Sequence, residues 1–146
     1  MIANRAQIEA LIPQQGAMCL LDRVEFCDGQ RIICSSMQHR ALANPLRVQA
    51  GLSSLHGIEF AAQAMAAHGG LTATARSRPR VGLLLSARDC VFYRRRLDDL
   101  LGPLIVEAEL IGNHDQTRMY RFTITTQDAS VVDGRATVML RDGAWP

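Results

Sequence analysis

The sequence predicts an α+β fold in which a curled antiparallel β-sheet wraps one long buried central helix. Residues 54–68 read as a helix that is apolar on nearly every side, and such a helix is a buried one. After Pro79 the pattern changes to short apolar segments separated by turn signals, which is typical of consecutive antiparallel strands. One sheet cannot cover a helix on every side, so we expect a second subunit to complete the burial.

The N-terminal segment is predicted to begin with a short amphipathic helix. Residues 3–11 place Ile8 and Leu11 on one side of such a helix. Pro13 ends it, because the residue before a proline is pushed out of the helical region. We interpret this segment as a lid or an entry to the rest of the fold.

A β-hairpin is predicted next. Residues 18–26 and 31–35 are apolar and rich in strand formers, and Asp28-Gly29 between them is a tight-turn signal. Residues 40–51 have little periodicity and are predicted to form an irregular loop. Loops of this kind often carry functional residues.

The central helix has recognisable ends. Ser53 or Ser54 can cap its first turn, and Gly69-Gly70 is expected to supply a left-handed stop. The strands that follow are predicted at residues 81–85, 89–95, 104–111, 119–126 and 130–140. Their turns are expected near Gly102-Pro103, Gly112-Asn113 and Asp133-Gly134.

Composition limits the functional classes. A length of 146 residues fits a single domain over residues 1–146, and the net charge of +2 is too small for a dedicated nucleic-acid binder. All sixteen cationic residues are arginines, which is compatible with anionic ligands. No apolar stretch is long enough to span a membrane. The four scattered cysteines lack the spacing of a metal site, so we expect a cytoplasmic protein without a metal.

Three polar residues interrupt the apolar central helix. His56, Glu59 and Gln63 lie at positions i, i+3 and i+7, so they share one stripe of the helix. A carboxyl group in such surroundings is a candidate general acid or base, and Gln63 could hydrogen-bond it and fix its rotamer. The alternatives are that Glu59 pairs with a loop or a partner's arginine in a structural role, and that His56 is a satisfied core or interface imidazole.

Several segments carry a family resemblance. The run HGIEFAAQAMA at residues 56–66 resembles the central-helix motif of 3-hydroxyacyl-[acyl carrier protein] dehydratases, where a catalytic Glu is followed four residues later by Gln. IPQQGAMCLLDRV at residues 12–24 resembles the N-terminal signature of these proteins, and VFYRRRL at residues 91–97 resembles their Phe-Arg-Arg strand. With NPLR at residues 44–47 and HGG at residues 68–70, the chain looks closest to the branch found in aryl polyene biosynthesis clusters.

The resemblance implies a hotdog fold, a dimer, and a tunnel for the acyl chain at the subunit interface. It implies elimination of water from a 3-hydroxyacyl thioester in fatty acid or aryl polyene type biosynthesis. The substrate would be carried on the phosphopantetheine of an acyl carrier protein, without any further cofactor. Glu59 would protonate the leaving hydroxyl, while a His from the other subunit's loop would take the α-proton.

The chain departs from this pattern at the base. The family's Gly-His-Phe-Pro-Gly loop has no match, and Asn44 stands beside the proline. An amide is not a base, although Asn44 can hydrogen-bond a thioester carbonyl. His39 or His56 could substitute as the base, and Gln14 stands where related proteins often have His.

Two further groups have open interpretations. Gly57 could offer its N–H to a thioester oxygen at the positive end of the helix, or it could only permit close packing. Arg94, Arg95 and Arg96 could meet an acidic carrier protein together with Arg47 and residues 76–80, or they could form a solvated surface.

Two other functions compete with a dehydratase. The first is a hotdog thioesterase, in which Glu59 activates water or attacks the thioester. The second is a non-catalytic subunit that binds an acyl carrier within a heteromeric dehydratase, which the missing loop His favours. A homodimer is expected, with a heterodimer of two hotdog subunits as the alternative.

Overall fold

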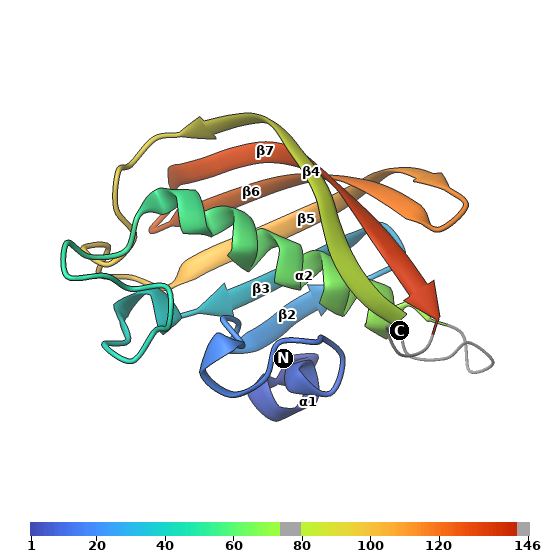
Figure 1. Cartoon of the computed structure of the whole chain (residues 1–146), viewed down its shortest axis with the longest axis horizontal. Helices are drawn as coiled ribbons and strands as arrows, with labels where there is room; N and C mark the ends of the chain where they lie inside the picture. Colours follow the sequence, from blue (N-terminus) through green and yellow to red (C-terminus); the bar gives the residue numbers. More distant parts are fainter. Residues whose placement is uncertain (74–79, 143–146) are drawn as a thin grey trace.

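The computed structural model describes residues 1–73 and 80–142, and it confirms the α+β architecture. A seven-stranded antiparallel sheet with the order β1-β2-β3-β5-β6-β7-β4 curves around helix α2 (Figure 1). The strands are β1 (Ala3–Asn4), β2 (Arg23–Cys27), β3 (Arg31–Ser36), β4 (Arg80–Phe92), β5 (Leu104–His114), β6 (Thr117–Thr126) and β7 (Ala129–Asp142). The helices are α1 (Arg5–Glu9) and α2 (Gly57–Leu71), with short 3₁₀ turns at Gly16–Met18, Gln38–Arg40 and Ser54–His56.

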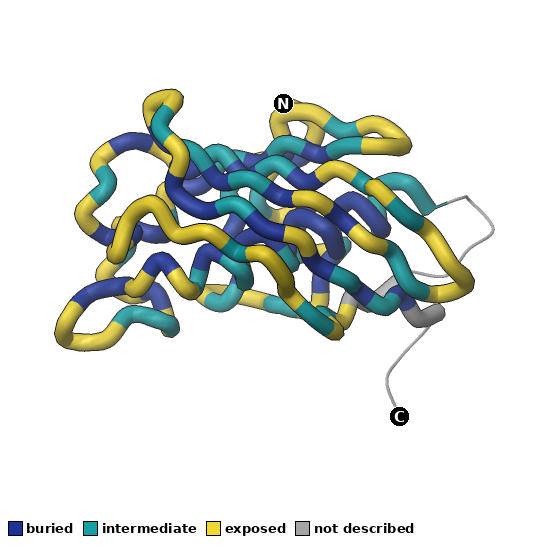
Figure 2. Tube along the Cα trace, turned by 90° about the horizontal axis from the view of Figure 1, so that it is seen from above, coloured by how far each residue is buried: buried dark blue, intermediate teal, exposed yellow. Residues whose placement is uncertain are grey.

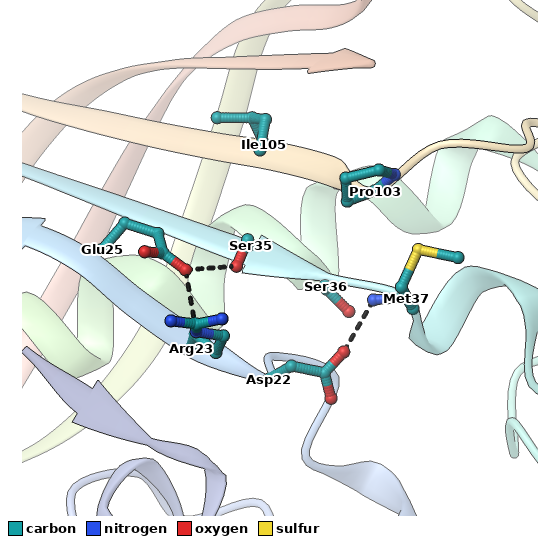
Figure 3. Close-up of a pocket in the computed structure, with 8 residues that line it drawn as sticks. All are labelled: Asp22, Arg23, Glu25, Ser35, Ser36, Met37, Pro103 and Ile105. Atoms are coloured by element: carbon teal, nitrogen blue, oxygen red, sulfur yellow. Dashed lines mark hydrogen bonds and ion pairs between the residues drawn. The ribbon is translucent and has the colours of Figure 1, made fainter. Parts of the chain in front are cut away.

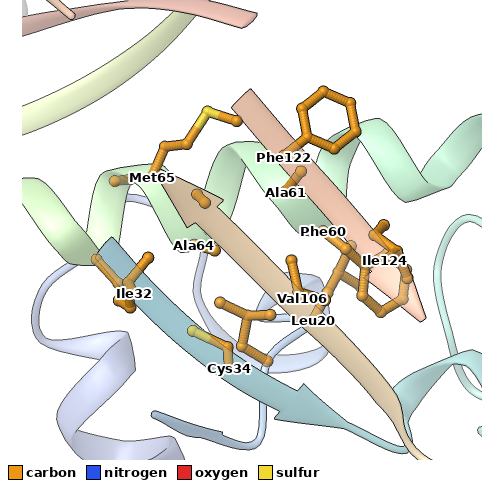
Figure 4. Close-up of a cluster of buried hydrophobic side chains, with 14 of the residues drawn as sticks. Leu20, Ile32, Cys34, Phe60, Ala61, Ala64, Met65, Val106, Phe122 and Ile124 are labelled. Carbon is orange, nitrogen blue, oxygen red and sulfur yellow. The ribbon is translucent and has the colours of Figure 1, made fainter. Parts of the chain in front are cut away.

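The central helix is buried as predicted. Ten of the fifteen residues of α2 are buried, and its apolar side chains pack against the inner face of the sheet (Figure 4). Phe60 and Met65 are fully buried there, together with Phe122 of β6. Viewed from above, buried segments run through the middle of the molecule, and exposed ones lie at loops and alternate with buried ones along the strands (Figure 2). The helix and the inner face of the sheet therefore share one core.

One stripe of α2 stays partly open. Ile58, Glu59 and Ala62 are only half-buried, and Leu55 in the preceding turn is exposed. These positions lie on neighbouring turns of the helix, so they form a single strip along it. This open strip is where a second subunit was expected to complete the burial.

The helical segment begins at the predicted Ser54, but as a 3₁₀ turn that leads into α2 at Gly57, and it ends later than predicted. The Ser53 side chain accepts a hydrogen bond from the Leu55 N–H at 3.2 Å, which caps the first turn. Gly69 and Gly70 do not stop the helix, which continues to Leu71. A Cβ on Gly69 would lie 3.2 Å from Leu140, and one on Gly70 would lie 3.0 Å from Leu11. These glycines permit close packing and do not terminate the helix.

The first hairpin is confirmed with a shorter first strand. The Asp28 carboxylate accepts hydrogen bonds from the backbone N–H groups of Gln30 and Arg31, both at 2.8 Å, which fixes the turn. Strand β2 begins only at Arg23, because residues 16–21 turn inward and bind the central helix. At the N-terminus, the Asn4 side chain caps α1 by accepting a bond from the Gln7 N–H.

Two predicted turns are wrong. Gly112-Asn113 lies inside β5, and the chain turns at Asp115, which has a φ of 53°. Asp133-Gly134 lies inside β7, where a Cβ on Gly134 would come within 2.7 Å of the Phe122 ring. The turn before β7 is formed by residues 127–128, both with positive φ, which Asp tolerates better than most residues.

Strand β4 replaces two predicted strands. The predicted strands at residues 81–85 and 89–95 form one strand that ends at Phe92, with register shifts between Leu84 and Ser86 and between Arg88 and Val91. Among the strands of the described residues it pairs with β7 alone, so it forms one edge of the sheet. Most of the expected arginine loop at residues 76–80 lies outside the described residues.

Within residues 1–73 and 80–142, no helix is both long enough and apolar enough to cross a membrane.

Candidate active site around Glu59

Glu59 lies in the first turn of α2 with a half-buried side chain. Two amide groups donate hydrogen bonds to the same carboxyl oxygen, Oε1. They are Gln63 Nε2 at 3.1 Å and Gln14 Nε2 at 3.3 Å. The predicted contact between Gln63 and Glu59 is therefore present. In the described part of the chain, the other oxygen, Oε2, accepts no hydrogen bond, so it is the oxygen that remains available to a ligand.

Gln63 is fully buried and anchors the N-terminal segment. Its Oε1 accepts from the Leu20 N–H at 2.8 Å, and its Nε2 donates to the Met18 carbonyl at 2.8 Å as well as to Glu59. The backbone partners settle which end of the amide is which, since an N–H only donates and a carbonyl only accepts. Three hydrogen bonds therefore hold the Gln63 amide in the orientation in which it donates to Glu59.

Gln14 contacts Glu59 in the structure, although the sequence did not point to it as a candidate site residue. It reaches Glu59 from the loop after α1, across 45 positions of sequence. Its own oxygen, Oε1, is buried and has no hydrogen-bond partner among the described residues. The only sequence signal was its position in a motif where related proteins often carry His.

His56 ends the 3₁₀ turn that leads into α2 and is half-buried. Its side chain makes no hydrogen bond to Glu59 or to any other described residue. The two residues are one helical turn apart, as the spacing predicted. The role of His56 as a base stays a prediction.

His39 lies in the turn Gln38–Arg40 and is completely buried. Its Nε2 is 2.9 Å from the Leu100 carbonyl, so Nε2 carries the hydrogen and Nδ1 is unprotonated. Nδ1 has no partner among the described residues. Burial lowers the pKa of this imidazole, which keeps it neutral. His39 is in a basic form, but it is enclosed and not bonded to Glu59.

Asn44 is buried and holds its own loop together. Its Nδ2 donates to the Gln38 carbonyl at 2.9 Å, and its Oδ1 accepts from the Leu46 N–H at 2.9 Å. Both ends of the amide therefore have partners inside the loop. The structure accounts for Asn44 by this structural role, and its predicted contact with a thioester carbonyl stays a prediction.

Gly57 lies where helix α2 packs closely against the sheet. A Cβ at this position would lie 3.1 Å from both Ile124 and Val132 of the sheet. Its N–H already donates to the carbonyl of Ser54 within the 3₁₀ turn. These observations favour the packing alternative over the oxyanion role, which stays a prediction.

Asp98 ties the loop before α2 to the segment after β4. This buried carboxylate accepts a hydrogen bond from the Leu52 N–H at 2.9 Å and one from Arg96 Nε at 3.0 Å. The hydrogen bond from Arg96 holds the pKa of Asp98 well below its usual range. Gly51, with a φ of 118°, passes so close that a Cβ would lie 2.7 Å from the carboxylate.

The predicted arginine patch is divided by this arrangement. Arg96 and Arg47 are both paired with Asp98, the latter at 3.7 Å. Arg94 and Arg95 are exposed. The carbonyl of Arg95 accepts from the Ser54 N–H at 2.9 Å, which places this exposed pair beside the start of α2.

A well-formed cavity lies elsewhere in the described part of the chain. It has a volume of about 380 Å³ and lies near the ends of β2, β3 and β5, with Glu25, Ser35 and Ile105 in its lining (Figure 3). These residues alternate with buried ones that face α2, so the cavity is on the outer face of the sheet. Glu59 does not line it, and the acyl tunnel stays a prediction.

Comparisons with known proteins bear on the fold and on the family. Among solved structures, the chain resembles the dehydratase heterocomplex ApeI:P from Xenorhabdus doucetiae, with a TM-score of 0.78 and 20% identity over 92% of this chain and 91% of that chain. A thioesterase from Haemophilus influenzae gives a TM-score of 0.65 and 13% identity, covering 97% and 93% of the two chains. A thioesterase from Staphylococcus aureus gives 0.60 and 14%, covering 82% and 92%.

At these identities the structural likeness establishes the fold, which is the predicted hotdog fold. No curated protein sequence matches the chain. The sequence profile of the ApeP-like family, described as ApeP dehydratase, matches residues 6–144, which is nearly the whole chain. This dehydratase-like hotdog protein therefore belongs to the ApeP-like dehydratase family.

Proposed function

We propose that this chain is a subunit of a dehydratase that eliminates water from a 3-hydroxyacyl thioester, with Glu59 as the proton donor to the leaving hydroxyl. The arrangement of the Glu59 carboxyl carries the proposal. Two amides hold one of its oxygens, and the other oxygen has no partner in the described part of the chain. The family supports dehydratase chemistry at a general level.

The hydrogen bonds to Glu59 Oε1 indicate which oxygen of the carboxyl would carry the proton. Oε1 accepts from both amides, so a proton on the carboxyl belongs on Oε2. During elimination a base removes the α-proton, a double bond forms between the α- and β-carbons, and the C–O bond to the hydroxyl breaks. Glu59 Oε2 gives its proton to the departing oxygen, which leaves as water. The base and Glu59 then exchange protons with solvent and return to their starting states.

The base has two possible sources. Within this chain His56 is better placed than His39, because it is half-buried one turn before Glu59 whereas His39 is enclosed. The other source is a second hotdog subunit. The likeness to a dehydratase heterocomplex of two proteins, ApeI and ApeP, supports such a partner.

Strand β4 supports the presence of a second subunit. It is an edge strand of thirteen residues, so one side of its backbone has no partner strand within the described chain. Apolar side chains are exposed along it and just beyond it: Leu83, Leu85, Val91, Phe92 and Tyr93. A second hotdog subunit that pairs along β4 would continue the sheet and cover the open strip of α2. We propose this subunit to be either another copy of the chain or an ApeI-type protein.

The substrate carrier is proposed to be an acyl carrier protein. The exposed Arg94 and Arg95 lie beside the N-terminal end of the helix that carries Glu59. Guanidinium groups suit both the phosphate of phosphopantetheine and an acidic protein surface. The acyl chains would be those of fatty acid or aryl polyene type biosynthesis.

The test follows the mass of the acyl chain. A 3-hydroxyacyl thioester on carrier protein is incubated with the chain alone and with the chain mixed with an ApeI-type subunit. We expect the loss of one water, and a rate that falls by roughly 10²- to 10⁴-fold in Glu59→Gln. Glu25→Gln, a carboxyl on the outer face of the sheet, is the matched control and should retain the rate.

Other products would contradict the proposal. Release of free acid and free thiol would assign the site to a thioesterase. If no water is lost in either mixture, the chain is a binding subunit without dehydratase chemistry. Elimination only in the mixture, still dependent on Glu59, would place the base on the partner.

A further inference from the structure

The orientation of one amide near Glu59 follows from its neighbours. Gln63 Nε2 donates to Glu59 Oε1, and this orientation is fixed because Gln63 also bonds two backbone groups. Oε1 is therefore an acceptor in this network. Gln14, which faces the same oxygen at 3.3 Å, must present its NH₂ group to it. The carbonyl oxygen of Gln14 consequently points away from Glu59.

That carbonyl oxygen, Gln14 Oε1, is buried and has no donor among the described residues. Leaving a buried acceptor without a partner costs about 1–3 kcal/mol. Most buried polar groups in proteins are therefore hydrogen-bonded, and an exception needs an explanation such as a functional role. The amide cannot turn over to relieve this, because it would then point its oxygen at Glu59 Oε1. A bound molecule with a hydrogen-bond donor would satisfy it.

We propose that Gln14 Oε1 accepts a hydrogen bond from the 3-hydroxyl group of the acyl substrate, which makes Gln14 a residue that selects hydroxylated acyl chains. The inference rests on the proposed function. The two ends of one amide are close together, so Oε1 lies near the carboxyl that delivers its proton to the same hydroxyl. A water molecule leaves with two hydrogens. Glu59 Oε2 supplies one, and the hydroxyl's own hydrogen stays bonded to Gln14 Oε1 while the C–O bond breaks.

The test compares two ligands that do not react. Both are pantetheine amides, in which nitrogen replaces the thioester sulfur, one with a 3-hydroxyacyl chain and the other with the matching unsubstituted chain. Binding is measured in the assembly that is active in the elimination assay. We expect the hydroxylated ligand to bind about 2- to 10-fold more tightly, which corresponds to one neutral hydrogen bond of about 0.5–1.5 kcal/mol.

Gln14→Met should remove this preference. The variant should bind the unsubstituted ligand with an affinity within about twofold of that of the unchanged protein. Gln49→Met, a change at an exposed glutamine, is the matched control and should keep the preference. Equal binding of both ligands to the unchanged protein would overturn the inference. Equal weakening of both ligands in Gln14→Met would also overturn it, because Oε1 would then bond the pantetheine arm.

Failure of the inference can be told from failure of the proposed function. If water is eliminated but the two ligands bind equally, only the role of Gln14 is wrong. If no water is eliminated and neither ligand binds, the proposed function is wrong and the role of Gln14 falls with it.

Discussion

The two halves of α2 each carry a polar network, and the networks differ in completeness. In the second half, His68 is fully buried, and its Nε2 donates to the Asp28 carbonyl at 2.8 Å. Its Nδ1 accepts from the Tyr120 hydroxyl at 2.7 Å, and Thr72 Oγ1 donates to the His68 carbonyl. In the first half, Glu59 is half open, and both its Oε2 and Gln14 Oε1 have no partner within the described residues.

The two networks suit different roles, one structural and one in binding a ligand. A buried network in which every group is paired fixes one arrangement of the chain and has nothing left to offer a ligand. A half-open network with a carboxyl oxygen and an amide oxygen to spare can receive a substrate's hydrogen-bonding groups. The same helix therefore carries a closed structural network and the open network of the proposed site. Three substitutions or conditions test this division.

The largest expected effect is at Gln63, which belongs to both packing and the site. Gln63→Leu leaves the buried Leu20 N–H and the partly buried Met18 carbonyl without partners, and it removes a donor from Glu59. We expect the free energy of unfolding to fall by about 2–4 kcal/mol and elimination to slow. Denaturant unfolding measures the first, with exposed Gln49→Leu as the control. An unchanged stability would show that this amide is not an anchor.

A smaller effect is expected at Tyr120, which belongs only to the closed network. Tyr120→Phe leaves His68 Nδ1 without its donor, so unfolding should become easier by about 1–3 kcal/mol. The elimination rate of the folded protein should not change. Tyr93→Phe is the matched control, since that exposed hydroxyl bonds Asp133 at 2.8 Å near the surface. A slower reaction in Tyr120→Phe would mean that the two networks are coupled.

The smallest effect is a dependence of stability on pH. Burial lowers the pKa of both His68 and His39, so the unfolded chain binds protons that the folded chain does not. The free energy of unfolding therefore has its full value above the unfolded pKa of about 6.5, and it falls as the pH drops below that value. The slope is at most about 1.4 kcal/mol per pH unit for each histidine. Denaturant unfolding at pH values from 7 to about 5 measures this slope. The free energy of unfolding should depend less on pH in His68→Phe, and its pH dependence should not change in His114→Phe, where the side chain is exposed.

Local patterns were predictable from the sequence. The burial of α2 followed from its composition, and the contact of Gln63 with Glu59 followed from their spacing of four positions. The hairpin turn followed from Asp28. Contacts between distant segments could not be found this way. Gln14 meets Glu59 across 45 positions and His68 meets Tyr120 across 52, and neither pair has a local pattern.

Glycines account for most of the errors in the fold. Gly69, Gly70 and Gly134 were interpreted as breaks or turns, but they lie inside α2 and β7. A missing Cβ serves both a positive φ and a close approach by a neighbour. The neighbours that decide the matter here are Leu140, Leu11 and the ring of Phe122, all distant in sequence.

The irregular edge strand β4 has a consequence for how the protein avoids aggregation. Its apolar stretches around Leu83 and Val91 are separated by Arg88 and Asp89, where the register of the strand shifts. A flat, uniform edge would accept almost any extended chain, whereas charges and bulges reject most of them. We expect β4 to pair along its whole length only with a strand that carries a matching irregularity. The edge would therefore discriminate against misfolded chains as well as admit the proposed partner subunit.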